Sequence, residues 1–288
     1  MKPLKGACII GQSGGPTAVI NASALGAIQT ALQCEPVTRV LGAANGIEGV
    51  LKERLFDMAQ EDPEELELLK YTPASALGSC RYRMADPAVD DTDYRRLLEV
   101  FRKYDVRYFF YNGGNDSMDT CNKISKFMQQ SGYECRVIGI PKTIDNDLYG
   151  TDHCPGFGSA AKFIATSCME VHQDLRVYDK GRVTIVEIMG RHAGWLAGSA
   201  ALATYAGAGP DLVYLPEVPF RMEEFWQDVD RIYKRNGSCM VAVSEGVQYA
   251  DGRFVAESGD RDVFGHTQLG GLGAMLAESV KRQTGAKV

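Results

Sequence analysis

The stretch VRYFFYNGGNDSMDTCNKISKFMQQSGYECRVIGIP, residues 106–141, indicates the fold class most clearly. Two short apolar runs, VRYFFY and CRVIGI, flank a segment in which apolar residues recur at helical spacing. A strand, a helix and a second strand of these lengths are typical of two parallel strands joined by a helical crossover. The stretch therefore predicts one β-α-β unit of a parallel α/β sheet.

The same alternation of strand and helix runs through the rest of the chain. Further strands are expected at residues 7–11, 37–42, 182–190, 211–216 and 239–246, and further helices at residues 91–105, 156–179, 193–207, 221–237 and 267–285. The segment YGTDHCPGFG concentrates glycine and proline and marks a boundary. We therefore expect domains at 1–155 and 156–288, with a ligand between them.

Composition excludes two classes of function. The chain of 288 residues has 31 basic and 37 acidic residues, and this net charge of -6 argues against a nucleic-acid-binding protein. No apolar run reaches membrane-spanning length, and the N-terminal MKPLKGACIIGQSGG lacks a signal-peptide core, so we expect a cytoplasmic protein without membrane contact. The eight cysteines form no C-x-x-C pair and are expected to be buried thiols.

Polar clusters lie at the carboxyl ends of five of the expected strands. They are QSGGP (12–16), NGGNDS (112–117), PKTIDND (141–147), MGRHAG (189–194) and SEG (244–246). In open parallel sheets, ligands bind at the carboxyl ends of the strands. The regular placement of these clusters therefore predicts one functional site.

Two of these clusters are glycine-rich turns that precede helices. Backbone amides after Gly14 and Gly15 are suited to phosphate, although a tight turn without a ligand has the same sequence. The second turn places Gly114 before Asp116 and Ser117. These polar residues suit a helix cap, and the Asp116 carboxylate also suits Mg²⁺ whose other ligands are phosphate oxygens and water.

PKTIDND contains the residue types that phosphoryl transfer needs. Such a reaction uses a base, a cation that neutralises the transferred group and donors that orient it. Asp145 or Asp147 supplies the base, Lys142 the cation and Thr143 a donor. The alternative is that DND forms only an Asx turn that ends a loop.

Together these motifs resemble the phosphofructokinase family over nearly the whole chain. SGG, LGSCR, GGNDS, PKTIDND, GTDHCPGFGSA, VEIMGRHAG, PEV and SEG occur in the family's order. The resemblance implies two Rossmann-like, three-layer α/β domains with parallel sheets and an interdomain cleft. Residues 1–155 would bind the phosphoryl donor and residues 156–288 fructose 6-phosphate. It also implies a further strand beyond the position of Val288, with a glutamine-arginine element for the sugar's 6-phosphate.

The resemblance also assigns roles to single residues. Asp145 is the expected base for the sugar's 1-hydroxyl, which Thr143 and Asp147 orient. An oligomer, a homodimer or homotetramer, is implied because Arg182 matches an arginine that reaches a neighbouring subunit's site. The expected donor contacts are Gly14, Gly15, Arg81, Gly114, Asp116 and Ser117, and the expected sugar-phosphate contacts are Met189, Gly190, Arg191 and Glu245.

Two positions indicate the phosphoryl donor. Family members that use ATP have glycine at the position of Asp116 and usually at that of Lys142, so this chain resembles the pyrophosphate-dependent branch. Asn115 replaces a second aspartate of many members, so Mg²⁺ would depend on Asp116 and water. We expect reversible, Mg²⁺-dependent transfer from pyrophosphate to fructose 6-phosphate. The alternatives are an ATP-dependent phosphofructokinase and a non-catalytic sugar-phosphate-binding or regulatory subunit.

Overall fold

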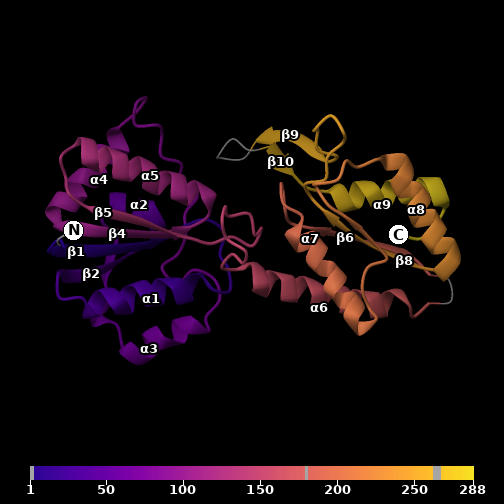
Figure 1. Ribbon diagram of the computed structural model, residues 1–288, viewed down its shortest axis with the longest axis horizontal. Helices are drawn as coiled ribbons and strands as arrows, with labels where there is room; N and C mark the ends of the chain where they lie inside the picture. Colours follow the sequence, from indigo (N-terminus) through magenta and orange to yellow (C-terminus); the bar gives the residue numbers. More distant parts are fainter. Residues whose placement is uncertain (1–2, 179–180, 262–266) are drawn as a thin grey trace. The chain divides into compact units, whose positions relative to one another are not determined.

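The computed structural model describes residues 3–178, 181–261 and 267–288, and the chain divides into two compact units, Met1–Thr143 and Ile144–Val288 (Figure 1). The sequence places the boundary after residue 155, whereas the units divide after Thr143. The Ile144 side chain packs against the buried cluster that contains Cys168 and Leu196, and this contact assigns the following loop to the second unit. The functional role of each half stays a prediction.

The first unit is built on a five-stranded sheet. Its strands are β1 (Gly6–Gln12), β2 (Val37–Ala43), β3 (Leu55–Asp57), β4 (Val106–Gly113) and β5 (Arg136–Pro141), in the order β3-β2-β1-β4-β5. β3 runs antiparallel to β2, and the other pairings are parallel. Gln12 pairs with Asn112, and Gly113 pairs with Pro141. The segments that follow β1, β4 and β5 therefore begin side by side.

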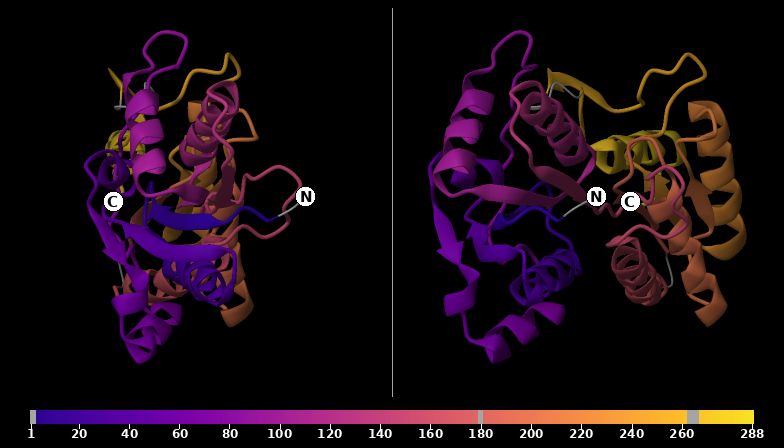
Figure 2. Two further views of the ribbon diagram at one scale, coloured as in Figure 1. Left: turned by 90° about the vertical axis from the view of Figure 1, so that its left-hand side faces the viewer. Right: turned by 60° about the vertical axis from the view of Figure 1, so that its left-hand side comes forward.

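Helices cover both faces of this sheet (Figures 1 and 2). They are α1 (Ile20–Gln33), α2 (Gly46–Leu51), α3 (Pro63–Glu67), α4 (Thr92–Lys103) and α5 (Asn115–Gln130), with 3-10 turns η1 (Met58–Gln60) and η2 (Leu68–Lys70). Side chains alternate along β1, as the period of a strand requires. Ile9 joins the core beneath α4 and α5, while Cys8 and Ile10 join the core beneath α1. The unit therefore has three layers.

The second unit has a smaller parallel sheet. β6 (Val183–Ile188), β8 (Cys239–Ser244) and β7 (Leu212–Tyr214) pair in the order β6-β8-β7. Strands β9 (Glu257–Arg261) and β10 (Thr267–Leu269) form a separate antiparallel pair. Ile188 pairs with Ser244, so the segments after β6 and β8 begin beside each other.

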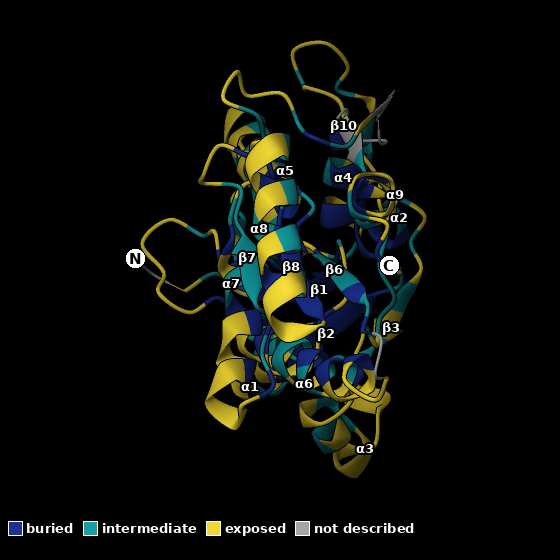
Figure 3. Cartoon of the chain, turned by 90° about the vertical axis from the view of Figure 1, so that its right-hand side faces the viewer, coloured by how far each residue is buried: buried dark blue, intermediate teal, exposed yellow. Residues whose placement is uncertain are grey.

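Two helical layers enclose this sheet as well. The helices are α6 (Phe157–Leu175), α7 (Trp195–Ser199), the 3-10 helix η3 (Ala200–Ala206), α8 (Met222–Asn236) and α9 (Leu272–Thr284). Met240 and Ala242 on β8 pack toward α6 and α7, whereas Val241 and Val243 pack toward α8 and α9. The central strand β8 is accordingly buried, β6 and β7 are mostly half-buried, and the outer helical faces are exposed (Figure 3). The predicted α/β class with parallel sheets is confirmed.

Differences from the predicted elements have local causes. The last helix is expected from residue 267, but α9 begins at Leu272 because Gly270 and Gly271 adopt positive φ angles of 152° and 74°. The helix expected over residues 193–207 is α-helical as far as Ser199 and then continues as η3. The short elements α2 and β3 have no clear periodic pattern, and the sequence does not predict them.

All eight cysteines lie in the described part of the chain and are free thiols, as predicted. Five are buried and Cys80 and Cys135 are half-buried, but Cys34 is exposed, so the expected burial is wrong for that residue. Burial raises the pKa of Cys8, Cys121, Cys135 and Cys239 to about 12. Across the residues that the structure describes, none of the helices is both long and apolar enough to cross a bilayer.

Candidate functional site

The turn after β1 carries the first expected donor contacts. Gly14 has a φ of 75°, in the left-handed region that favours glycine. Its carbonyl accepts a hydrogen bond of 2.6 Å from the Ser79 hydroxyl, and the Gly15 carbonyl accepts one from the Lys142 ammonium. A Cβ on Gly15 would meet nothing within 4 Å. The turn is thus held from two sides while open space remains beside Gly15.

The turn after β4 leads directly into α5. A Cβ on Gly113 would collide with the Ser117 side chain, so close approach of the chain requires glycine there. Gly114 occupies the N-cap position and makes no side-chain cap bond, and Asp116 lies exposed in the first helical turn. The N-cap position is therefore taken by Gly114 and not by Asn115 or Asp116. The helix start instead presents backbone N–H groups beside a carboxylate.

Lys142 joins these two turns. Its backbone N–H donates to the Gly113 carbonyl at 3.0 Å, and the residue is 5% exposed. A Cβ added to Gly14 would lie 3.3 Å from Lys142 Nζ and 3.6 Å from the Gly114 nitrogen. The first unit therefore brings Gly14, Gly15, Gly114 and Lys142 together, as the strand-end argument predicted. A lysine ammonium and backbone amides at one place suit a small, highly charged anion.

Arg81 lies two residues after Ser79, which contacts the first glycine turn. Ser79 bonds to the Gly14 carbonyl, and the Arg81 side chain that follows it is exposed. This placement puts the Arg81 segment next to the first glycine turn, and a guanidinium is a group that can bind phosphate in a bidentate manner.

A magnesium ion fits the residues of this half. The described residues contain no group of three or more His, Cys, Asp or Glu side chains placed to hold a metal. Mg²⁺ does not need such a group, because it is commonly bound by one or two carboxylates together with substrate phosphates and water. The exposed Asp116 carboxylate in the first turn of α5 satisfies that requirement.

The second unit begins with the loop that contains Asp145 and Asp147. Between them, Asn146 has a φ of 58° and is 6% exposed. Its amide donates to the Asp152 carbonyl at 3.1 Å, and its side-chain oxygen accepts from the Cys154 N–H at 2.8 Å. Asn146 thus performs the local bonding expected of an Asx residue. The two aspartates flank this fixed point.

The ends of β6 and β8 gather the expected sugar-phosphate contacts. The Gly190 N–H donates to Glu245 Oε1 at 3.2 Å, and the Glu245 N–H donates to the Ile188 carbonyl at 2.8 Å. A Cβ on the following Gly246 would collide with the Arg191 carbonyl. Met189, Gly190, Arg191 and Glu245 therefore lie together, as predicted.

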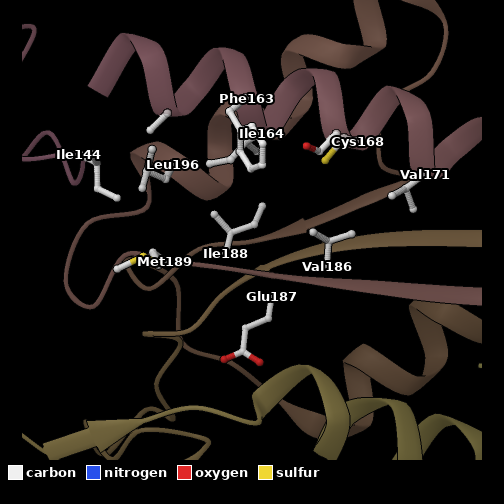
Figure 4. A pocket seen from close by; sticks show the side chains of 12 residues that line it. Ile144, Phe163, Ile164, Cys168, Val171, Val186, Glu187, Ile188, Met189 and Leu196 are labelled. Atoms are coloured by element: carbon white, nitrogen blue, oxygen red, sulfur yellow. The ribbon is translucent and has the colours of Figure 1, made fainter. Parts of the chain in front are cut away.

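A cavity of about 280 Å³ connects this cluster with the aspartate loop (Figure 4). Ile144 and Met189 both line it, together with apolar side chains of α6 and β6. Glu187 turns away from the cavity, and its Oε2 accepts from the Gly273 N–H at 2.8 Å. The cavity is too apolar for a phosphate, but it shows that the Ile144 loop lies next to the end of β6.

Arg182 is separated from this cluster. It precedes β6, whereas Met189 follows that strand, and six residues of strand span about 20 Å. Its guanidinium lies 4.5 Å from the centre of the Tyr178 ring and 4.0 Å from Asp174 Oδ2. Arg182 is therefore not part of the site formed at the other end of β6.

The sequence profile of phosphofructokinase matches residues 7–288. The chain belongs to the phosphofructokinase family. This membership confirms the resemblance that the ordered motifs suggested.

Relatives within the phosphofructokinase family cover nearly all of this chain. A Halomonas elongata protein named "Pyrophosphate--fructose 6-phosphate 1-phosphotransferase" is 48% identical over 280 residues, which are 96% of this chain and 67% of that protein. A Methylococcus capsulatus protein of the same name is 49% identical with the same coverage. The crystal structure of a pyrophosphate-dependent phosphofructokinase from Marinobacter aquaeolei has a TM-score of 0.82 at 43% identity, covering 99% of this chain and 67% of that one.

Two residues that shape these phosphofructokinase turns were not predicted from the sequence. Ser79 bonds to Gly14, as described above. Glu217 Oε1 accepts from the Gly194 N–H at 2.7 Å and so holds the turn after Arg191. Glu217 follows β7 closely, and the strand-end rule applied to PEV would have found it.

We expect Gly190→Ala to destabilise the second unit by roughly 1–3 kcal/mol. Gly190 has a φ of 136°, and an added Cβ would lie 2.6 Å from the Ala193 carbonyl oxygen. The measurement is the midpoint of chemical denaturation. Gly198→Ala in α7 is the matched control, because its Cβ would meet Leu215 at 4.0 Å and alanine favours helix. Equal midpoints for the two variants would contradict the strain at Gly190.

Proposed function

We propose that this protein transfers a phosphoryl group reversibly from pyrophosphate to the 1-hydroxyl of fructose 6-phosphate, giving fructose 1,6-bisphosphate and phosphate. The observation that carries the proposal is the junction of Lys142 with the two glycine turns. The names of the relatives that share about half of its residues support the same reaction.

On the donor side, Lys142 neutralises charge on the transferred group. Gly14, Gly15 and Gly114 let pyrophosphate approach the backbone, while Arg81 and Ser117 add contacts. The Asp116 side chain occupies the room that an inner phosphate of ATP would need and repels its charge. This combination favours a donor with two phosphates and no nucleoside.

Mg²⁺ is the proposed metal of this reaction. Asp116 would hold it together with phosphate oxygens and water, and the bound ion would neutralise charge on the diphosphate. Asn115 contributes no charge to this site, so the ion would be bound mainly through pyrophosphate itself.

On the acceptor side, Asp145 accepts the proton of the sugar's 1-hydroxyl. Thr143 and Asp147 orient that hydroxyl toward the phosphoryl group. The remaining contacts hold the sugar phosphate, with Arg191 suited to its charge and Met189, Gly190 and Glu245 to its sugar part. Each of these roles rests on the match to the family's motif.

We also propose that the active protein is a homodimer or homotetramer. Arg182 supports this because it lies at the opposite end of β6 from Met189, outside the site of its own unit. In an oligomer it would serve the site of a neighbouring subunit.

The test is the initial rate of fructose 6-phosphate phosphorylation with Mg²⁺ and either pyrophosphate or ATP. We expect pyrophosphate to be favoured by roughly two orders of magnitude in kcat/KM, which corresponds to about 3 kcal/mol of discrimination. A preference for ATP would reject the donor assignment. Binding of fructose 6-phosphate without turnover by either donor would favour the regulatory-subunit alternative.

A further inference from the structure

Gln12 is a polar residue buried at the end of a core strand. Its side chain is 0% exposed, between the apolar interior of β1 and the glycine turn that begins at Ser13. Burying a carboxamide costs free energy unless its hydrogen bonds are made. Gln12 makes all four, because Nε2 donates to the Ile20 carbonyl at 3.3 Å and to Asn21 Oδ1 at 3.0 Å, and Oε1 accepts two more.

The two bonds to Oε1 come from a segment that has no regular structure. Residues 72–91 contain neither helix nor strand. The Ser75 hydroxyl donates to Gln12 Oε1 at 3.0 Å, and the Leu77 N–H donates to the same oxygen at 2.9 Å. A segment without strand partners needs such side chains to satisfy its backbone.

Asn21 acts together with Gln12 on this segment. The Ala76 N–H donates to Asn21 Oδ1 at 2.8 Å, and Asn21 Nδ2 donates to the Thr72 carbonyl at 2.9 Å. Asn21 Oδ1 is also the acceptor for Gln12 Nε2. Two buried carboxamides therefore fix residues 72–77 in the way that a neighbouring strand would fix an edge strand.

The anchored segment leads directly to Arg81. Ser79 bonds to the Gly14 carbonyl, and the Ser79 carbonyl accepts from Asn45 Nδ2 at 3.3 Å. Gln12 is adjacent in sequence to the turn that holds Gly14. The Gln12 side chain thus holds the segment before Arg81 in place beside the glycine turn.

We propose that Gln12 is a positioning residue for pyrophosphate, which acts by holding residues 75–80 so that Arg81 faces the glycine turns. This inference rests on the proposed function. A purely structural role of these hydrogen bonds would lower stability without a rise confined to the KM for pyrophosphate.

The test is a double-mutant cycle on the intact chain with Gln12→Met and Arg81→Ala. We expect Gln12→Met to raise the KM for pyrophosphate about tenfold, with kcat changed by less than about threefold and the KM for fructose 6-phosphate unchanged. In the Arg81→Ala background the same change should raise the KM by no more than about twofold, because the residue through which it acts is absent.

The controls separate positioning from loss of folding. Gln29→Met removes a partly buried carboxamide that bonds to Glu67, and it should leave every constant unchanged. Ser75→Ala removes one of the two bonds to Gln12 Oε1 without touching the core, and we expect about a threefold rise in the KM for pyrophosphate.

Different experimental results would overturn the positioning role of Gln12 and the proposed function. An unchanged KM for pyrophosphate in Gln12→Met and Ser75→Ala, or equal effects of Gln12→Met with and without Arg81, would overturn the positioning role while the wild type still used pyrophosphate. A wild type that neither turns over nor binds pyrophosphate would overturn the proposed function instead. Calorimetric binding of pyrophosphate supplies this second measurement.

Discussion

Replacing Asp145 with serine should lower kcat by two to four orders of magnitude while fructose 6-phosphate still binds. A general base contributes about 10²–10⁴-fold to a rate, and a serine hydroxyl is not basic enough to replace a carboxylate. The loop itself should persist, because Asn146 fixes it through Asp152 and Cys154. The loss should therefore appear in the chemical step and not in folding.

Steady-state rates with pyrophosphate measure kcat of Asp145→Ser, and calorimetry measures its binding of fructose 6-phosphate. Asp152→Ser is a suitable control, because it removes an exposed carboxylate from the same loop while the Asp152 carbonyl still accepts from Asn146. Turnover by Asp145→Ser equal to that of the control would reject the base assignment.

Lys142→Met should have the second largest effect, a fall of about 10²–10³-fold in kcat/KM with pyrophosphate. The substitution removes the charge that lies at the junction of the glycine turns and keeps an unbranched side chain of similar length. Stability should change little, because the substitution removes the hydrogen bond to the Gly15 carbonyl together with the cost of burying an ammonium. The loss of activity is thus expected to exceed any effect on stability.

Initial rates with pyrophosphate and thermal unfolding, measured on the same preparation of Lys142→Met, test the expected activity and the expected stability. Lys123→Met is the matched control, because this lysine lies on α5 and pairs with Asp119 at the surface, where an ion pair contributes little. A large loss of stability in Lys142→Met would show that the lysine is a structural residue, and unchanged kcat/KM would remove it from the donor site.

Much of the fold was accessible from sequence because its signals are local. Strand β4 and helix α5 follow from the apolar pattern of residues 106–132, and the strand-end rule correctly grouped Gly15 and Lys142 although 127 positions separate them. The same rule grouped Gly190 with Glu245, since parallel neighbours end at the same edge of a sheet.

The supporting contacts were not accessible because they join residues without a shared pattern. Nothing in the sequence around Gln12 indicates that its oxygen receives bonds from Ser75 and Leu77, which lie 63 and 65 positions away. Backbone conformation was equally hidden at Asn146, whose left-handed φ depends on bonds to Asp152 and Cys154. Residue type suggested a turn there, and only the folded loop shows which residue forms it.

The distribution of thiols has a practical consequence for spectroscopy. The thiolate is the reactive form of cysteine, and burial raises the pKa of Cys8 and Cys239 to about 12, so both thiols stay protonated at neutral pH. Alkylating reagents should therefore pass over Cys8 and Cys239 and modify Cys34, which is exposed at the end of α1. That helix starts five residues after Gly15 and is about 21 Å long. A fluorophore on Cys34 would lie about one helix length from the start of α1 and would report on the first unit without an engineered cysteine.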